Sequence, residues 1–96
     1  SRREAYGEYI RTLRRDENFW PALYYLAEIY TEEDPNFARR QFSLCLEKID
    51  SQGADSGGHG EILPILLDGF DVAYFRHLCE RWIDKLHTRG EKYAHR

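Results

Sequence analysis

Residues 20–50 read WPALYYLAEIYTEEDPNFARRQFSLCLEKID and contain two apolar segments joined by a short polar turn. The first segment predicts a helix over 19–32, with Pro21 in its first turn, where a missing N–H costs nothing. Asp34, followed directly by a proline, is typical of a helix start and predicts a second helix over 35–50. Because so few residues separate the two helices, we expect them to fold back as an antiparallel hairpin.

Helical patterns also flank this hairpin on both sides. Residues 4–15 carry an amphipathic stripe, which predicts a helix that ends before a polar turn. Residues 51–60 are rich in Gly and nearly devoid of apolar side chains, so they predict a flexible loop. A short helix over 61–69 and a longer one over 71–88, opened by Asp71 as N-cap, complete a prediction of about five helices.

The chain matches itself when it is shifted by 33 residues. A period near 34 residues, made of helix–turn–helix units, is typical of a helical solenoid. The shift places apolar or small residues of the first helix on similar residues of the third: Ala5 on Ala38, Tyr9 on Phe42, Thr12 on Cys45 and Leu13 on Leu46.

The hairpin resembles the tetratricopeptide repeat family. The positions that carry the resemblance are Leu23, Leu26, Ala27, Tyr30, Ala38, Phe42, Cys45 and Leu46. The resemblance implies an all-α fold, a short right-handed helical-hairpin solenoid, as a single domain over 1–96. Its parts would be a half repeat over 4–18, one repeat over 19–50, the loop over 51–60 and diverged helices over 61–88. The chain departs from the family pattern in a turn shortened by one residue and in Glu17 and Ser51, which replace the usual closing proline.

The resemblance also implies a binding surface, because the first helix of each such repeat lines a concave face that holds peptides or partner helices. The positions that would line it here are Pro21, Tyr24, Tyr25, Glu28, Thr31 and Glu32. Tyrosines are frequent contact residues at protein interfaces, and the two glutamates favour a basic peptide or helix. The alternative is that both tyrosines pack against a neighbouring helix of the same chain.

Composition limits the classes of partner. The net charge of −3 argues against nucleic acid, whose phosphates require a basic surface. No apolar run approaches the roughly 20 residues of a membrane-spanning helix, so we expect no membrane insertion. Cys45 and Cys79 lie within apolar helical patterns and predict buried free thiols rather than a disulfide, which favours a reducing, cytoplasmic location. The chain begins at Ser1 and has no Met, so we interpret it as a processed product or an excised piece.

Catalysis and metal binding find little support in the sequence. The side chains of His77, Glu80, Asp84 and His87 share one helix face and are of types that ligate zinc or iron. A single helix cannot close such a site, because bundle metal centres take ligands from several helices. We therefore predict no metal, no cofactor and no enzymatic activity.

The sequence thus predicts a scaffold or adaptor that binds another protein. Two alternatives remain open. One is a structural subunit that self-associates into a homo-oligomer, and the other is a helical accessory domain of a larger enzyme or transport complex.

Overall fold

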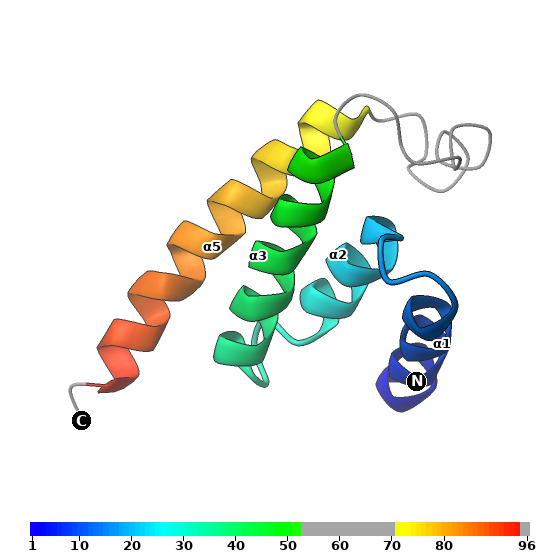
Figure 1. Cartoon of the computed structure of the whole chain (residues 1–96). Helices are drawn as coiled ribbons and strands as arrows, with labels where there is room; N and C mark the ends of the chain where they lie inside the picture. Colours follow the sequence, from blue (N-terminus) through cyan, green and yellow to red (C-terminus); the bar gives the residue numbers. More distant parts are fainter. Residues whose placement is uncertain (53–70, 95–96) are drawn as a thin grey trace.

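A computed structural model describes residues 1–52 and 71–94, with side chains through residue 87, and these residues form four α-helices and no strand. The helices are α1 (Arg2–Arg15), α2 (Trp20–Ile29), α3 (Pro35–Gln52) and α5 (Val72–Ala94) (Figure 1). The all-α prediction is confirmed. The expected total of about five helices is not, because the helix predicted over 61–69 lies outside the described residues.

Side-chain caps determine where three of the helices begin. The backbone N–H of Glu4 donates to Oγ of Ser1 over 3.3 Å at the start of α1. Asp34 Oδ1 accepts from the third residue of α3 over 3.1 Å, and Asp71 Oδ1 accepts from the third residue of α5 over 2.9 Å. Each acceptor satisfies an N–H that has no partner within its helix. The starts predicted at Asp34 and Asp71 are confirmed.

The ends of α2 and α3 differ from the sequence prediction. Helix α2 ends at Ile29, three residues earlier than predicted. The N–H of Tyr30 donates to the carbonyl oxygens of Ala27 and Glu28, and the chain enters a tight turn. Helix α3 continues to Gln52, two residues into the predicted loop, where Gln52 Nε2 donates to the carbonyl oxygen of Asn18 over 2.6 Å. This contact anchors the last turn of α3 to the chain that leads into α2.

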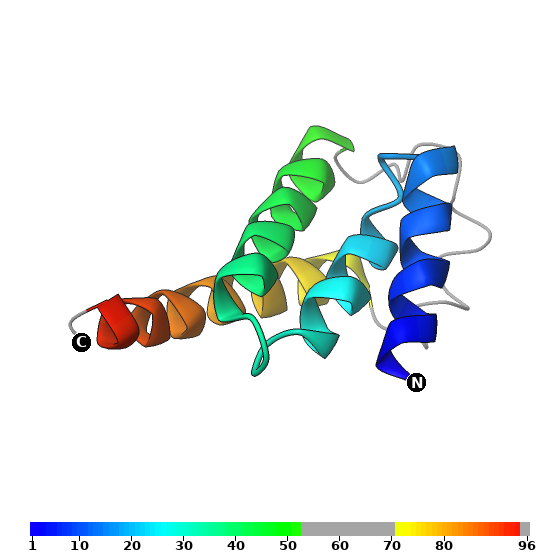
Figure 2. The same ribbon diagram turned by 90° about the horizontal axis from the view of Figure 1, so that it is seen from below.

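Helices that follow one another in the described chain run antiparallel. The pairs Tyr6–Tyr30 and Tyr9–Tyr25 match early residues of α1 with late residues of α2. The ion pair between Arg76 and Asp50 joins the start of α5 to the end of α3. Figures 1 and 2 both show α2 between α1 and α3, so α1 contacts the rest of the described molecule chiefly through α2.

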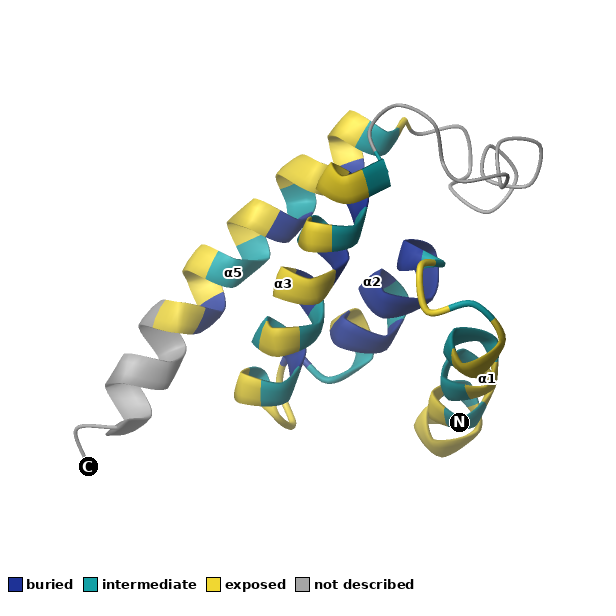
Figure 3. Cartoon of the chain, in the orientation of Figure 1, coloured by how far each residue is buried: buried dark blue, intermediate teal, exposed yellow. Residues whose placement is uncertain are grey.

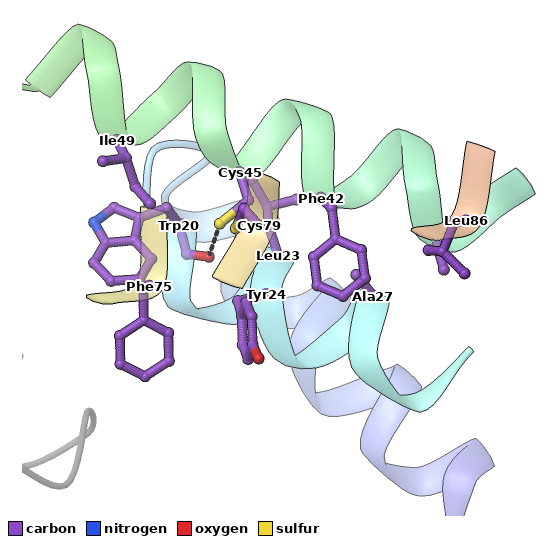
Figure 4. Packing of buried hydrophobic residues seen from close by; sticks show 11 residues of the cluster. Trp20, Leu23, Tyr24, Ala27, Phe42, Cys45, Ile49, Phe75, Cys79 and Leu86 are labelled. Atoms are coloured by element: carbon purple, nitrogen blue, oxygen red, sulfur yellow. Dashed lines mark hydrogen bonds between the residues drawn. The ribbon is translucent and has the colours of Figure 1, made fainter. Parts of the chain in front are cut away.

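The hydrophobic core lies among α2, α3 and α5 (Figure 3). Ala27 of α2 and Ala38 of α3 are completely buried, and their small side chains let the two helix backbones approach closely. Phe42 of α3 lies at the centre of this core, in contact with rings of α2 and α5. Helix α1 contributes no fully buried residue and covers α2 with half-buried side chains. The main buried side chains, most of them drawn in Figure 4, are Trp20, Leu23, Tyr24, Phe42, Cys45, Ile49, Phe75, Cys79 and Leu86.

Candidate functional site

Three of the six residues predicted to line a partner surface are buried. The side chains of Pro21, Tyr24 and Thr31 are shielded from solvent, and Tyr24 is only 4% exposed. The Tyr24 ring lies 5.5 Å from the ring of Phe42 and 5.1 Å from that of Phe75, measured between centroids. Tyr24 therefore belongs to the core between three helices, which agrees with the alternative interpretation of this residue.

The hydroxyl group of Tyr24 lies between α2 and α5. Its neighbours include the carboxylate of Glu28, one turn later in α2, and the indole of Trp82 in α5. Burial, followed by the negative charge of Glu28, raises the pKa of Tyr24 above its ordinary value. The neutral phenol thus packs where the two helices meet.

The other three predicted residues reach the surface. Tyr25 is half-buried, and Glu28 and Glu32 are exposed. The Tyr25 ring stacks on that of Tyr9 in α1 at 6.3 Å, with the two planes 20° apart. Tyr24 and Tyr25 are neighbours in the sequence but differ in location: Tyr25 faces α1, whereas Tyr24 faces α3 and α5.

Tyr25 is part of a line of rings that crosses three helices. From Tyr9 of α1 the line passes to Tyr25 of α2, then over 6.5 Å to Phe75 of α5. Tyr74, whose ring lies 5.5 Å from Phe75, ends it with a side chain that is 42% exposed. We call Tyr9, Tyr25, Phe75 and Tyr74 the aromatic row.

One surface hollow adjoins Tyr9 and Tyr25 at one end of the aromatic row, and a second lies along α5 and begins one helical turn beyond Tyr74. The hollow between α1 and α2 has a volume of about 260 Å³ and includes Tyr9 and Tyr25 in its wall. The hollow beside α5 measures about 410 Å³, and the Lys85 ammonium lies 5.0 Å from the centre of the Trp82 ring in its wall. Its lining residues are Leu78, Arg81, Trp82, Asp84 and Lys85. Most of them continue the helical stripe that begins at Tyr74, so this hollow extends the aromatic row along α5.

Charges of both signs border the row. Glu28 is exposed on α2 and Glu32 in the turn that follows it, and Arg81 and Lys85 are exposed on α5. The glutamates alone favoured a basic partner, but α5 adds two cations to the same region. A segment that carries both charges matches this face better than a purely basic one.

Sequence reasoning missed most of the aromatic row. Tyr9 and Phe75 lie on the apolar stripes of their helices. Periodicity does not distinguish the centre of such a stripe from its border, so it does not reveal that these rings belong to the row. Tyr74 gave a usable signal, since it is a large aromatic side chain outside the apolar stripe of α5.

A surface groove with a volume of about 810 Å³ lies between α3 and α5. Its lining residues are Arg39, Arg40, Ser43, Leu44, Leu46, Glu47, Glu80, Ile83, Asp84 and His87. Arg39 Nη1 lies 2.9 Å from His87 Nδ1. A guanidinium can only donate, so Nδ1 accepts this hydrogen bond.

Helix α5 carries four side chains of types that can ligate a metal: His77, Glu80, Asp84 and His87. In the described part of the chain, no three His, Cys, Asp or Glu side chains are placed to share one metal ion. His87, the last of the four, already bonds Arg39.

The two cysteines are buried free thiols, as predicted. Cys45 of α3 donates to the carbonyl oxygen of Trp20 over 3.4 Å, and its sulfur lies beside that of Cys79 (Figure 4). The hydrogen bond between the two thiols, together with burial, raises the pKa of Cys45. The protonated, solvent-shielded thiol is a poor nucleophile, so Cys45 serves the packing of α2, α3 and α5.

Comparison with known proteins leaves the geometry as the basis for functional inference. No protein-family model, no curated protein and no solved structure matches the chain. Among the described helices, none combines the length and the apolar character needed to cross a membrane.

Proposed function

We propose that the chain is a protein-interaction scaffold or adaptor module that holds a peptide or a helix of a partner protein along the aromatic row. The observation that carries this proposal is the series of ring contacts across α1, α2 and α5, in which the buried Phe75 supports the half-buried Tyr25 and the exposed Tyr74. Tyrosines held by ring contacts offer large, rigid contact areas at little cost in conformational entropy.

The shape of the aromatic row indicates that the bound segment of the partner is short. Each of the two hollows can receive one or two side chains, and the half-exposed tyrosines between them can contact the partner backbone. Glu28 and Lys85 would then pair with opposite charges on the partner. We expect an apolar or aromatic anchor at each end of the bound segment, with charges of both signs between the anchors.

The same proposal includes a tetratricopeptide-like arrangement and a cytoplasmic location. Its support is the antiparallel packing of α1, α2, α3 and α5, with the small side chains of Ala27 and Ala38 completely buried. In this arrangement α1 is the second helix of a half repeat, α2 and α3 form one repeat, and α5 belongs to the diverged C-terminal part. The buried free thiols are in keeping with a reducing compartment.

Selection from a random-peptide phage library tests the proposed function. We expect the chain to enrich a family of related peptides, and synthetic copies to bind about tenfold or more weakly to Tyr25→Ser and Tyr74→Ser. Tyr6→Ser is the matched control, since Tyr6 is an equally exposed tyrosine (38%) outside the row, and its affinity should equal that of the unaltered chain.

Circular dichroism of each variant separates lost binding from lost folding. Tyr74 matters most here, because its exposed side chain can be removed with little effect on the core. Enriched peptides that bind the Tyr74→Ser and Tyr25→Ser variants as tightly as the unaltered chain would overturn the proposal.

A further inference from the structure

The groove between α3 and α5 combines an apolar centre with charged ends. Leu44 stands 38% exposed at its centre, next to the half-buried Ile83. Because α3 and α5 run antiparallel, Arg40 lies toward one end of the groove, whereas Glu47 and Glu80 lie toward the other. Asp84 also lines the groove, one residue beyond Ile83 toward the Arg40 end, and adds one carboxylate to the two arginines there. The groove therefore carries mainly basic side chains at one end, apolar ones at its centre and acidic ones at the other end.

The charges at the two ends are available for pairing. Arg40, Glu47 and Glu80 are exposed, and none of them forms an ion pair within residues 1–52 and 71–87. Arg39 differs from them, because its guanidinium is engaged with His87. An occupant of the groove would therefore find unpaired cationic and anionic side chains at opposite ends.

The spacing of these charges makes the surface complementary to itself. Arg40 and Glu47 are seven residues apart on one face of α3, which corresponds to two helical turns, or about 10 Å. Leu44 lies between them. A two-fold axis near Leu44 would bring the basic end of one copy onto the acidic end of another, and the same patch would serve both copies.

We propose that this groove docks a second copy of the chain, with the two α3 helices antiparallel and the two Leu44 side chains meeting at the axis. In this dimer Arg40 of each copy faces Glu47 of the partner subunit. The inference does not rest on the proposed peptide-binding function. The groove and the hollow beside Trp82 share only Asp84 among their lining residues, and none of the tyrosines of the aromatic row lines the groove, so the dimer leaves these tyrosines open.

Sedimentation over a concentration series at low ionic strength tests the dimer. We expect the unaltered chain to dimerise reversibly and the dimer to weaken as salt is added, because exposed ion pairs are screened. Arg40→Glu and Glu47→Arg should each weaken it by about tenfold or more, since each substitution turns two attractions into two repulsions.

Mixing the two charge variants gives the sharper result. The Arg40→Glu chain carries acidic groups at both ends, whereas in the Glu47→Arg chain the new cation lies beside Glu80 at one end and Arg40 remains at the other. Each variant alone should dimerise about tenfold or more weakly than the unaltered chain, and an equimolar mixture should form a heterodimer that is tighter than either variant's homodimer. Loss of folding cannot mimic this outcome, because a misfolded variant would not regain a specific partner.

Reversals outside the groove serve as controls. Arg3→Glu on α1 and Glu17→Arg in the turn before α2 change the net charge equally and should leave dimerisation unaltered. A chain that stays monomeric throughout the series would overturn the proposal and would leave the groove to a different protein. A dimer indifferent to the charge reversals, or variants that fail to pair when mixed, would overturn it as well.

Discussion

The side chains of Tyr24 and Tyr25 leave α2 about 100° apart, which sends them into different environments. Tyr24 joins the core through Phe42 and Phe75, whereas Tyr25 stacks on Tyr9 near the surface. The sequence could not separate these two roles, because apolar residues cover more than half of the circumference of α2 and leave no clear polar face. The exposure of Glu28 could be predicted, since a charged side chain without a buried partner remains in solvent.

Replacement of Tyr24 by Phe tests the contribution of its hydroxyl group to the packing of α2 on α5. The change retains the ring contacts and removes the polar group that lies near Glu28 and Trp82. We expect the free energy of unfolding at neutral pH to fall by about 1 kcal/mol. Urea unfolding measures this change, and an unaltered stability would show that the hydroxyl contributes nothing to the fold.

The same variant predicts a pH dependence. The pKa of Tyr24 is raised in the folded chain, so the unfolded chain releases this proton first, near the ordinary tyrosine value of about 10. The contribution of Tyr24 to the free energy of unfolding is complete below about pH 10, that is, below the ordinary tyrosine pKa. Above this pH the contribution declines by up to about 1.4 kcal/mol per pH unit. The difference in stability between the unaltered chain and Tyr24→Phe should therefore shrink as the pH rises toward about 11. A constant difference would contradict the raised pKa.

The starts of α3 and α5 were predictable from the sequence, because a cap is a local interaction between a side chain and the backbone a few residues away. Helix α2 begins without a side-chain cap. The ends of α2 and α3 were not predictable, since they depend on a tight turn and on the contact of Gln52 with Asn18. The internal repeat was only partly informative about burial. Phe42 is buried in α3, but its counterpart Tyr9 is half-buried in α1, because the described chain covers α1 on one side only.

Phe42→Ala tests the position of α3 at the centre of the core. Phe42 has no exposed surface, and its ring stacks on that of Trp82 at 5.6 Å. We expect a loss of about 3–5 kcal/mol in the free energy of unfolding, enough to unfold much of so small a domain. Leu44→Ala on the exposed side of the same helix is the control and should cost less than about 0.5 kcal/mol in the monomer. Equal losses would contradict the observed orientation of α3.

At the scale of the whole molecule, the candidate site depends on how helices distant in sequence are placed beside one another. The sequence predicted the helical class and the antiparallel hairpin, because short connections leave neighbouring helices little choice. It placed the site on α2 alone. The aromatic row also needs Tyr9 from α1 and Tyr74 from α5, and periodicity within a helix carries no information on the placement of helices relative to one another.

Chemical-shift mapping with a peptide selected by the chain tests the aromatic row most directly. Titration of the isotope-labelled chain should shift the amide and ring signals of Tyr9, Tyr25 and Tyr74, together with those of residues lining the hollow beside Trp82. Signals of Leu44 and Arg40, in the groove between α3 and α5, should stay in place. Shifts centred on that groove, with the tyrosine signals of the row unchanged, would contradict the assignment of the row as the partner-binding face.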